Sequence, residues 1–175
     1  MHVKIEQQLL AELSRRNIDL LTHFAEANPP AVDVLVGLVL SHRPKLAERA
    51  SWVLEKLSER NPGLLNDSLP RLIDNLKQIP SSSTRRTLAK VLSLHTLPEA
   101  CEGPVLDFCL TLLEDPKEPV AVKANCMSLV FQLLPKYPEL KNELFLLIED
   151  QLPYQSVGFA SRYKVLQKKY RSVLR

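Results

Sequence analysis

The four histidines of this 175-residue chain are its best candidates for catalysis or metal binding, yet their spacing suits neither. They are His2, His23, His42 and His95. None forms an HExxH motif or an i, i+4 pair, which would place two imidazoles on one helix face. No serine has a nucleophile-elbow context, and the four glycines are too dispersed for a phosphate loop. We therefore predict no catalytic residue, metal or cofactor, and a chain that is not an enzyme; His95 shares an apolar column with Leu57 and Leu133 and is expected to be a partly buried structural residue.

The cysteines also lack a pattern that indicates chemistry. Cys101, Cys109 and Cys126 are odd in number and show no CxxC spacing, so we expect three reduced thiols in apolar surroundings. The longest nearly apolar run, AVDVLVGLVL, contains Asp33 and is well short of the roughly 20 residues that a membrane-spanning helix needs. These features predict a soluble cytoplasmic protein without a membrane partner, and nothing indicates a small-molecule substrate.

Two clusters of basic residues are candidates for binding an anionic partner. Arg85 and Arg86 follow the run SSST at a predicted helix start, where free amides and the helix dipole attract a phosphate or carboxylate. The alternative is a Ser or Thr cap beside solvated arginines. The second cluster lies in the last 25 residues, which hold no acidic residue: Arg162, Lys164, Lys168, Lys169, Arg171 and Arg175.

Apolar residues recur every 38 positions, and this repeat must position any site. Three sets follow the interval: Val34, Leu72, Leu110 and Ile148; Val53, Val91 and Leu129; Leu54, Leu92 and Val130. A period in this range is typical of stacked two-helix units. Prolines punctuate the chain between segments of helical spacing. We expect an N-terminal helical region over 3–27 and helices near 31–41, 44–60, 63–78, 83–96, 103–114, 119–134, 138–152 and 157–174.

This pattern predicts an all-α, α-α superhelix of about four hairpins between N- and C-terminal capping helices, in one domain over 1–175. Because stacking buries both faces of each hairpin, the end helices should present a polar outer face. In the last helix we expect an inward apolar stripe and a basic outer surface. The inward stripe is Phe159, Tyr163, Leu166, Tyr170 and Val173.

The segments RASWVLEKL and VKANCMSLVFQLL, each followed by a Pro-led helix, resemble HEAT-like repeats of the armadillo-type superhelix class over roughly residues 31–155. The basic residue that such repeats place before a small residue matches Arg49 and Lys123, and more loosely Arg86. No Asp recurs at a fixed distance before them, so a regular Asp and Arg ladder is not expected. The resemblance implies a scaffold that binds proteins.

The segment AVKANCMSLVFQLLPKYPELKNEL is also similar to short helical-repeat chains sometimes labelled adenylosuccinate lyase. That enzyme family carries a Ser-rich loop of the form SSxMPxKxNP. The only serine run here, Ser81 to Ser83, has no Met or Asn beside it. The sequence therefore does not predict that activity.

Trp52 is the remaining candidate. Its 38-residue equivalents, Lys90 and Ser128, are polar, which indicates a solvent-facing position where Trp acts as a binding anchor. Alternatively it fills a gap between repeats, since Trp is usually largely buried.

Two function classes follow. The first is a non-catalytic interaction or scaffold module for a protein or peptide; the second is nucleic-acid binding through the basic C-terminal helix. Against the second, residues 1–150 carry 17 basic and 20 acidic side chains. The candidate partner-binding residues are Trp52, Arg49, Arg85, Arg86, Lys90, Arg162, Lys164, Lys168, Lys169 and Arg171.

Overall fold

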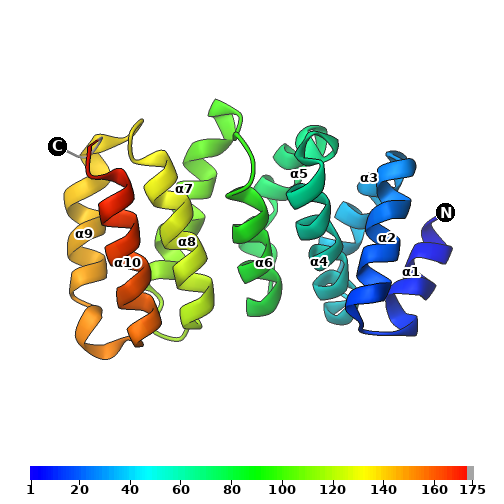
Figure 1. The fold of residues 1–175 in the computed structure, drawn as a ribbon, viewed down its shortest axis with the longest axis horizontal. Helices are drawn as coiled ribbons and strands as arrows, with labels where there is room; N and C mark the ends of the chain where they lie inside the picture. Colours follow the sequence, from blue (N-terminus) through cyan, green and yellow to red (C-terminus); the bar gives the residue numbers. More distant parts are fainter. Residues whose placement is uncertain (173–175) are drawn as a thin grey trace.

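The computed structural model describes residues 1–172 and is all-α over that range, with helices in two layers (Figure 1). The first layer contains α1 (His2–Ala11), α3 (Pro30–Val39), α5 (Leu69–Asp74), α7 (Glu99–Glu114) and α9 (Lys141–Glu149). The second layer contains α2 (Arg15–Ala27), α4 (Pro44–Arg60), α6 (Ser82–Leu92), α8 (Val120–Leu133) and α10 (Val157–Tyr170). Each second-layer helix packs against the next one along the chain. The predicted all-α superhelix is confirmed.

The N-terminal region forms a helix pair of its own, so the described chain holds five pairs rather than four pairs and a leading cap. Ser14 caps α2 by accepting a hydrogen bond from the Asn17 amide. The Asn17 side chain donates to the carbonyls of Gln8 and Glu12, which satisfies the end of α1. This network explains why the helix breaks between Ala11 and Arg15.

The helix predicted over 63–78 is interrupted. A 3₁₀ helix, Pro62–Ser68, precedes α5, and a second one, Leu76–Gln78, follows it. Pro70 falls in the first turn of α5, because proline lacks an amide donor and is tolerated only at a helix start. Two more 3₁₀ turns, Pro138–Leu140 and Leu152–Tyr154, flank α9, so the helix predicted over 138–152 is also shorter.

In contrast, α7 begins at Glu99, four residues before the predicted start, and continues through Pro104. Glu99 and Glu102 occupy its first turn, where acidic side chains are stabilised by the helix dipole. Glu102 is buried and accepts hydrogen bonds from Lys136 and from Tyr137 Oη, the latter at 2.9 Å. The hydrogen bond from Lys136 holds the pKa of Glu102 below its usual value, although burial opposes it.

The predicted 38-residue register is confirmed in the second layer. The sets containing Val53 and Leu54 are fully buried at every position, and they belong to one apolar core that extends from Ile5 to Leu166. In the first-layer set, Leu72 and Ile148 are buried, whereas Val34 and Leu110 pack half-buried at the edge. The three cysteines are buried and unpaired, as expected.

Ion pairs connect neighbouring helix pairs along this register. Three solvent-accessible pairs join a basic residue to an acidic residue 34 to 38 positions earlier: Arg43 to Glu6 at 2.6 Å, Arg60 to Glu26 at 2.9 Å, and Arg71 to Asp33 at 2.7 Å. They follow no Asp and Arg consensus, which agrees with the absence of that pattern in the sequence. Because all three are solvent-accessible, each contributes about 1 kcal/mol or less to stability.

The two ends of the stack differ. At the C-terminal end, the predicted inward stripe of α10 is confirmed for Phe159, Tyr163 and Leu166, which are buried, and for the half-buried Tyr170, although Val157 and Val165 of the same helix are exposed; Val173 lies outside the described residues. The expectation of a polar outer face is wrong at the N-terminal end. Several large apolar side chains of α1, α2 and their connection are exposed there, namely Met1, Val3, Leu10, Leu13, Leu20 and Phe24.

Candidate interaction surface

Trp52 lies on α4 in a hollow of about 220 Å³ between α4 and α6. It is half-buried and packs against the edge of the core, and its repeat equivalents Lys90 and Ser128 are also half-buried. The Trp52 side chain is therefore neither fully exposed to solvent nor completely buried between repeats, which were the two alternatives that the sequence left open. The exposed Arg86 of α6 lines the same hollow, together with Leu13, Glu48, Arg49, Glu55, Ser83 and Thr87.

The hollow combines an apolar surface with charge of both signs. Glu48 accepts a hydrogen bond from Ser83 Oγ at 2.7 Å, which connects α4 to α6 beside Trp52. Partial burial raises the pKa of Glu55, an effect that the nearby Lys56, Lys90 and Arg86 oppose. A partner that brings an apolar group and a hydrogen-bond donor would fit these walls.

Arg49 lines this hollow but its guanidinium is used within the fold. Its Nη1 donates to the carbonyl of Leu9, in the last turn of α1, at 2.5 Å. Lys123, its counterpart on α8, donates to the carbonyl of Leu113 at the end of α7 and to Gln151 Oε1. Both residues supply a positive charge at the negative end of a first-layer helix, and burial lowers the pKa of Lys123. Arg49 is thus primarily a structural residue.

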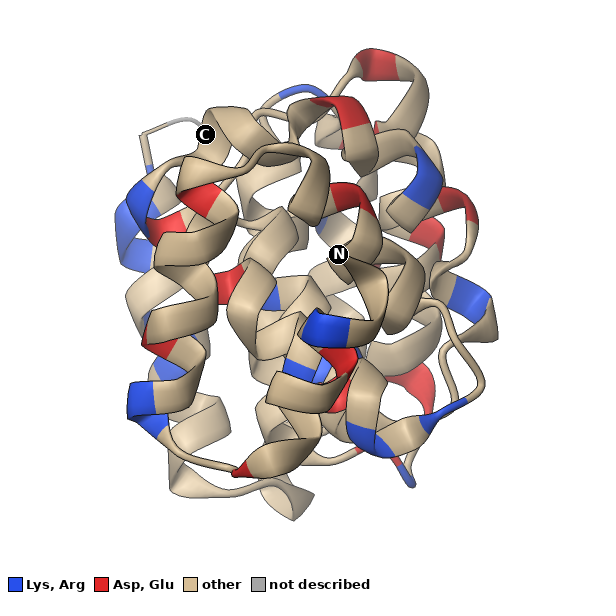
Figure 2. Cartoon of the chain, turned by 90° about the vertical axis from the view of Figure 1, so that its right-hand side faces the viewer, with Lys and Arg blue, Asp and Glu red and all other residues tan. Residues whose placement is uncertain are grey.

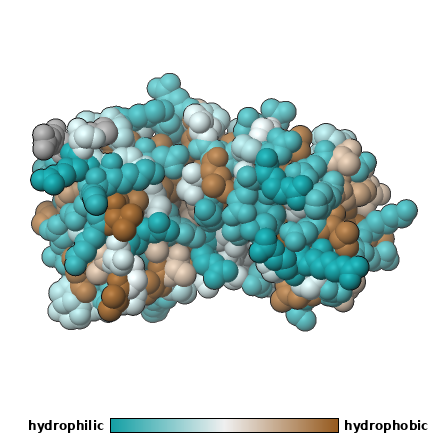
Figure 3. All heavy atoms as spheres, in the orientation of Figure 1, coloured by the Kyte–Doolittle hydropathy of each residue, from teal (hydrophilic) through white to brown (hydrophobic). Residues whose placement is uncertain are grey.

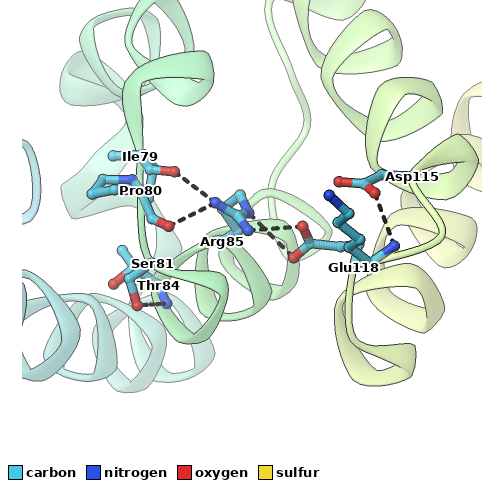
Figure 4. Close-up of polar contacts among 8 residues, drawn as sticks. Ile79, Pro80, Ser81, Thr84, Arg85, Asp115 and Glu118 are labelled. Atoms are coloured by element: carbon cyan, nitrogen blue, oxygen red, sulfur yellow. Dashed lines mark hydrogen bonds and ion pairs between the residues drawn. The ribbon is translucent and has the colours of Figure 1, made fainter.

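Arg85 differs from the expectation of a solvated arginine. Its Nε and Nη2 donate to the two carboxylate oxygens of Glu118 at 3.2 and 2.7 Å, and its Nη1 donates to the carbonyls of Ile79 and Pro80 (Figure 4). Ser81 caps α6, as the alternative interpretation proposed, by accepting from the Thr84 amide. The carboxylate expected near this helix start is therefore supplied by the chain itself, and Arg85 has little capacity left for a partner.

The basic residues of the C-terminal end form a separate surface. Arg162, Lys164, Lys168 and Lys169 lie exposed on α10, and the exposed Arg171 follows it. Lys169 Nζ lies 5.2 Å from the centre of the Tyr170 ring. Because α8 lies between α6 and α10, this cluster does not join the hollow around Trp52 (Figure 1).

Comparison with known families agrees with this architecture. A family model described as a HEAT repeat domain matches residues 5–169. The chain belongs to the HEAT repeat family. Neither the curated proteins nor the solved structures contain a match to it. HEAT repeat domains are generally non-catalytic scaffolds that mediate protein interactions.

His95 has a structural role in this HEAT domain. It is buried, and its Nε2 lies 3.0 Å from Ser58 Oγ. Since the Ser58 hydroxyl donates its single proton to the Leu54 carbonyl, Nε2 must be the donor to Ser58. Nδ1 has no partner among the described atoms, and burial lowers the pKa of the imidazole, so the neutral form is favoured. His95 is thus buried more fully than the partly buried position that the sequence predicted.

Two further observations bear on the sequence predictions. Within residues 1–172 no three His, Cys, Asp or Glu side chains gather in a way that would hold a metal ion. In the same part of the HEAT domain, no helix has both the length and the apolar character needed to cross a bilayer.

Sequence reasoning missed three features of this surface. Glu118 was not identified as the partner of Arg85, because nothing local relates residues 33 positions apart. Leu13 was not placed beside Trp52, since it reaches the hollow from the α1–α2 connection, which the helical pattern over 3–27 did not reveal. The apolar outer face of α1 and α2 was also missed. Composition gave no signal for it, because residues 1–24 are about as rich in apolar side chains as the chain as a whole.

Proposed function

We propose that this chain is a non-catalytic scaffold, a single helical repeat domain over 1–175 that binds a protein or peptide in the cytoplasm through its second-layer helices. The observation that carries the proposal is the hollow between α4 and α6, where Trp52 is half-buried beside the exposed Arg86. Trp and Arg are the residue types most enriched among binding hot spots.

The chemistry of the hollow supports a peptide or a short element of a partner protein. Trp52 offers a large apolar surface, Arg86 a forked donor, and Glu55 a partly desolvated carboxylate. A volume of about 220 Å³ suits one anchoring side chain rather than a drug-sized ligand, whose sites usually exceed about 300 Å³. Lys90, half-buried one turn after Arg86 on α6, extends the positive side of this surface.

The exposed cations of α10 support a second candidate function, nucleic-acid binding. Arg162, Lys164, Lys168 and Lys169 occur on this helix with no acidic residue among them, which creates a field that steers an anionic partner. We favour a secondary docking surface for an acidic protein, because the cations cover one helix and do not continue along the stack.

Binding to a labelled DNA duplex, measured by fluorescence anisotropy, distinguishes the two functions. We expect weak binding that collapses between about 50 and about 200 mM salt, as for sequence-independent phosphate contacts. Sub-micromolar, sequence-selective binding that survives physiological salt would instead favour the nucleic-acid function. Loss of such binding in a Lys168→Ala, Lys169→Ala double variant would locate it on α10, and Trp52→Ala serves as the control that leaves α10 intact.

A further inference from the structure

The N-terminal end of the stack exposes an apolar groove between α1 and α2. Met1, Leu20 and Phe24 line it and are 56, 55 and 42 % exposed, while the buried Ile5 and Leu21 contribute to its wall. The groove has a volume of about 320 Å³. Apolar residues are visible at this end in the space-filling view, at the right of the molecule (Figure 3).

The lining residues have the spacing of a helix-binding groove. On the α1 side, Met1, Lys4, Ile5 and Gln8 recur at i, i+3, i+4 and i+7, and on the α2 side Leu20, Leu21 and Phe24 occupy one turn. The groove therefore follows the helix axes for about 10 Å, or two helical turns. Inside the described stack, the corresponding face of each helix pair is covered by the preceding pair. The shape that fits it is another amphipathic helix.

Two cations border the groove. Lys4 lines it directly, and Arg16 lines an adjoining hollow that shares Gln8 and Leu20 with it. Both are exposed, and neither has an ion-pair partner among residues 1–172. Among the described residues that line the two hollows, Glu12 is the one acidic residue. In the view onto this end most of the ribbon is tan, with charged positions around it (Figure 2).

Charge argues against a second copy of the chain as occupant. Two grooves face to face would bring Lys4 and Arg16 of one copy near the same cations of the other. In a head-to-tail arrangement the groove would meet the last helix pair, where the four cations Arg162, Lys164, Lys168 and Lys169 of α10 outnumber the exposed Glu143 and Glu149 of α9. Repulsion between like charges opposes the face-to-face arrangement, and the excess of cations on α10 disfavours the head-to-tail one.

We propose that the groove between α1 and α2 binds an amphipathic helix of another protein, with an apolar stripe flanked by acidic residues. The apolar stripe packs on Leu20 and Phe24, and the acidic flanks pair with Lys4 and Arg16. This surface is separate from the hollow around Trp52, so the chain would hold two partners or two segments of one partner.

Two synthetic 15-residue helical peptides test the proposal, both with Leu at i, i+3, i+4 and i+7 and with either Glu or Lys at the flanking positions. Fluorescein-labelled peptides are titrated with the full chain and followed by anisotropy. We expect the Glu peptide to bind, and Phe24→Asp to weaken it at least about tenfold. The Lys4→Glu, Arg16→Glu variant should reverse the preference toward the Lys peptide. Circular dichroism confirms that these exposed changes preserve the fold.

Matched controls keep the outcomes distinct. Leu146→Asp, an exposed apolar position on α9, should leave peptide binding unchanged, as should Trp52→Ala, which tests the other surface. Equal binding of both peptides, or equal loss in Leu146→Asp, would overturn the proposal. So would concentration-dependent dimerisation in light scattering that Phe24→Asp abolishes, or phosphatidylglycerol-vesicle binding that Phe24→Asp abolishes in place of peptide binding, because these identify a second copy or a lipid surface as the occupant.

Discussion

Replacing Leu54 with alanine is expected to lower the free energy of unfolding by about 2 to 5 kcal/mol. Leu54 is fully buried on α4, which packs against α2, α3 and α6, so truncation leaves a cavity in the core around α4. Its repeat equivalent Leu92 occupies the same kind of position on α6 and should show a loss in the same range. Urea denaturation followed by circular dichroism measures both.

Lys168→Ala is the control for this comparison, since Lys168 is exposed on α10 and should change stability by less than about 0.5 kcal/mol. If Leu54→Ala and Lys168→Ala caused equal losses, the repeat register would be wrong. A normal loss at Leu54 with none at Leu92 would show that the 38-residue equivalence fails between these two units.

Replacing Arg85 with alanine should cost about 3 kcal/mol, because it leaves the carboxylate of Glu118 buried without its partner. The Glu118 side chain is 3 % exposed, and Arg85 joins it to the Ile79 and Pro80 carbonyls across the boundary between α6 and the α7–α8 connection. Arg85→Lys should recover little, since an ammonium group cannot form the forked contact with both oxygens. Urea denaturation again provides the measurement.

Arg86→Ala is the matched control, because the neighbouring Arg86 is exposed and donates no side-chain hydrogen bond in the described structure. Adding Glu118→Gln to Arg85→Ala should restore part of the stability by removing the uncompensated charge. If Arg85→Ala and Arg86→Ala destabilised the protein equally, or if Glu118→Gln made the loss worse, the ion pair would not be the stabilising element.

The sequence predicted α4, α6, α8 and α10 and their shared core well, because the 38-residue repeat of apolar residues indicates both, whereas α2 was not separated from α1 in the predicted region over 3–27. Leu54, Leu92 and Val130 repeat at one interval and face the same interior, so their periodicity reports burial directly. The first layer was predicted less well. There Pro70 divides a helix that looked continuous, and Pro104 lies inside one that begins earlier. Proline lies at the start of α5 but is tolerated inside α7. The local sequence therefore did not determine where these two helices begin.

The candidate surface was predicted only in part. Trp52 and Arg86 line the same hollow. Because they lie on adjacent second-layer helices, their proximity could be predicted from the repeat. Arg85 looked equivalent to Arg86, but the buried Glu118 distinguishes them, and that contact depends on how two units stack. The open N-terminal face likewise depends on the Asn17 network that breaks the leading helix.

Capture of partner proteins from lysate by three immobilised baits tests the central claim most directly. The baits are the wild-type chain, Trp52→Ala, and the Lys168→Ala, Lys169→Ala double variant, each incubated with lysate with and without nuclease treatment, and captured proteins are quantified by mass spectrometry. Because truncating an anchoring Trp typically weakens binding at least about tenfold, we predict a protein captured by the wild type and the double variant but lost with Trp52→Ala. The same proteins captured equally by the wild type and Trp52→Ala, or capture that nuclease treatment abolishes, would contradict the account.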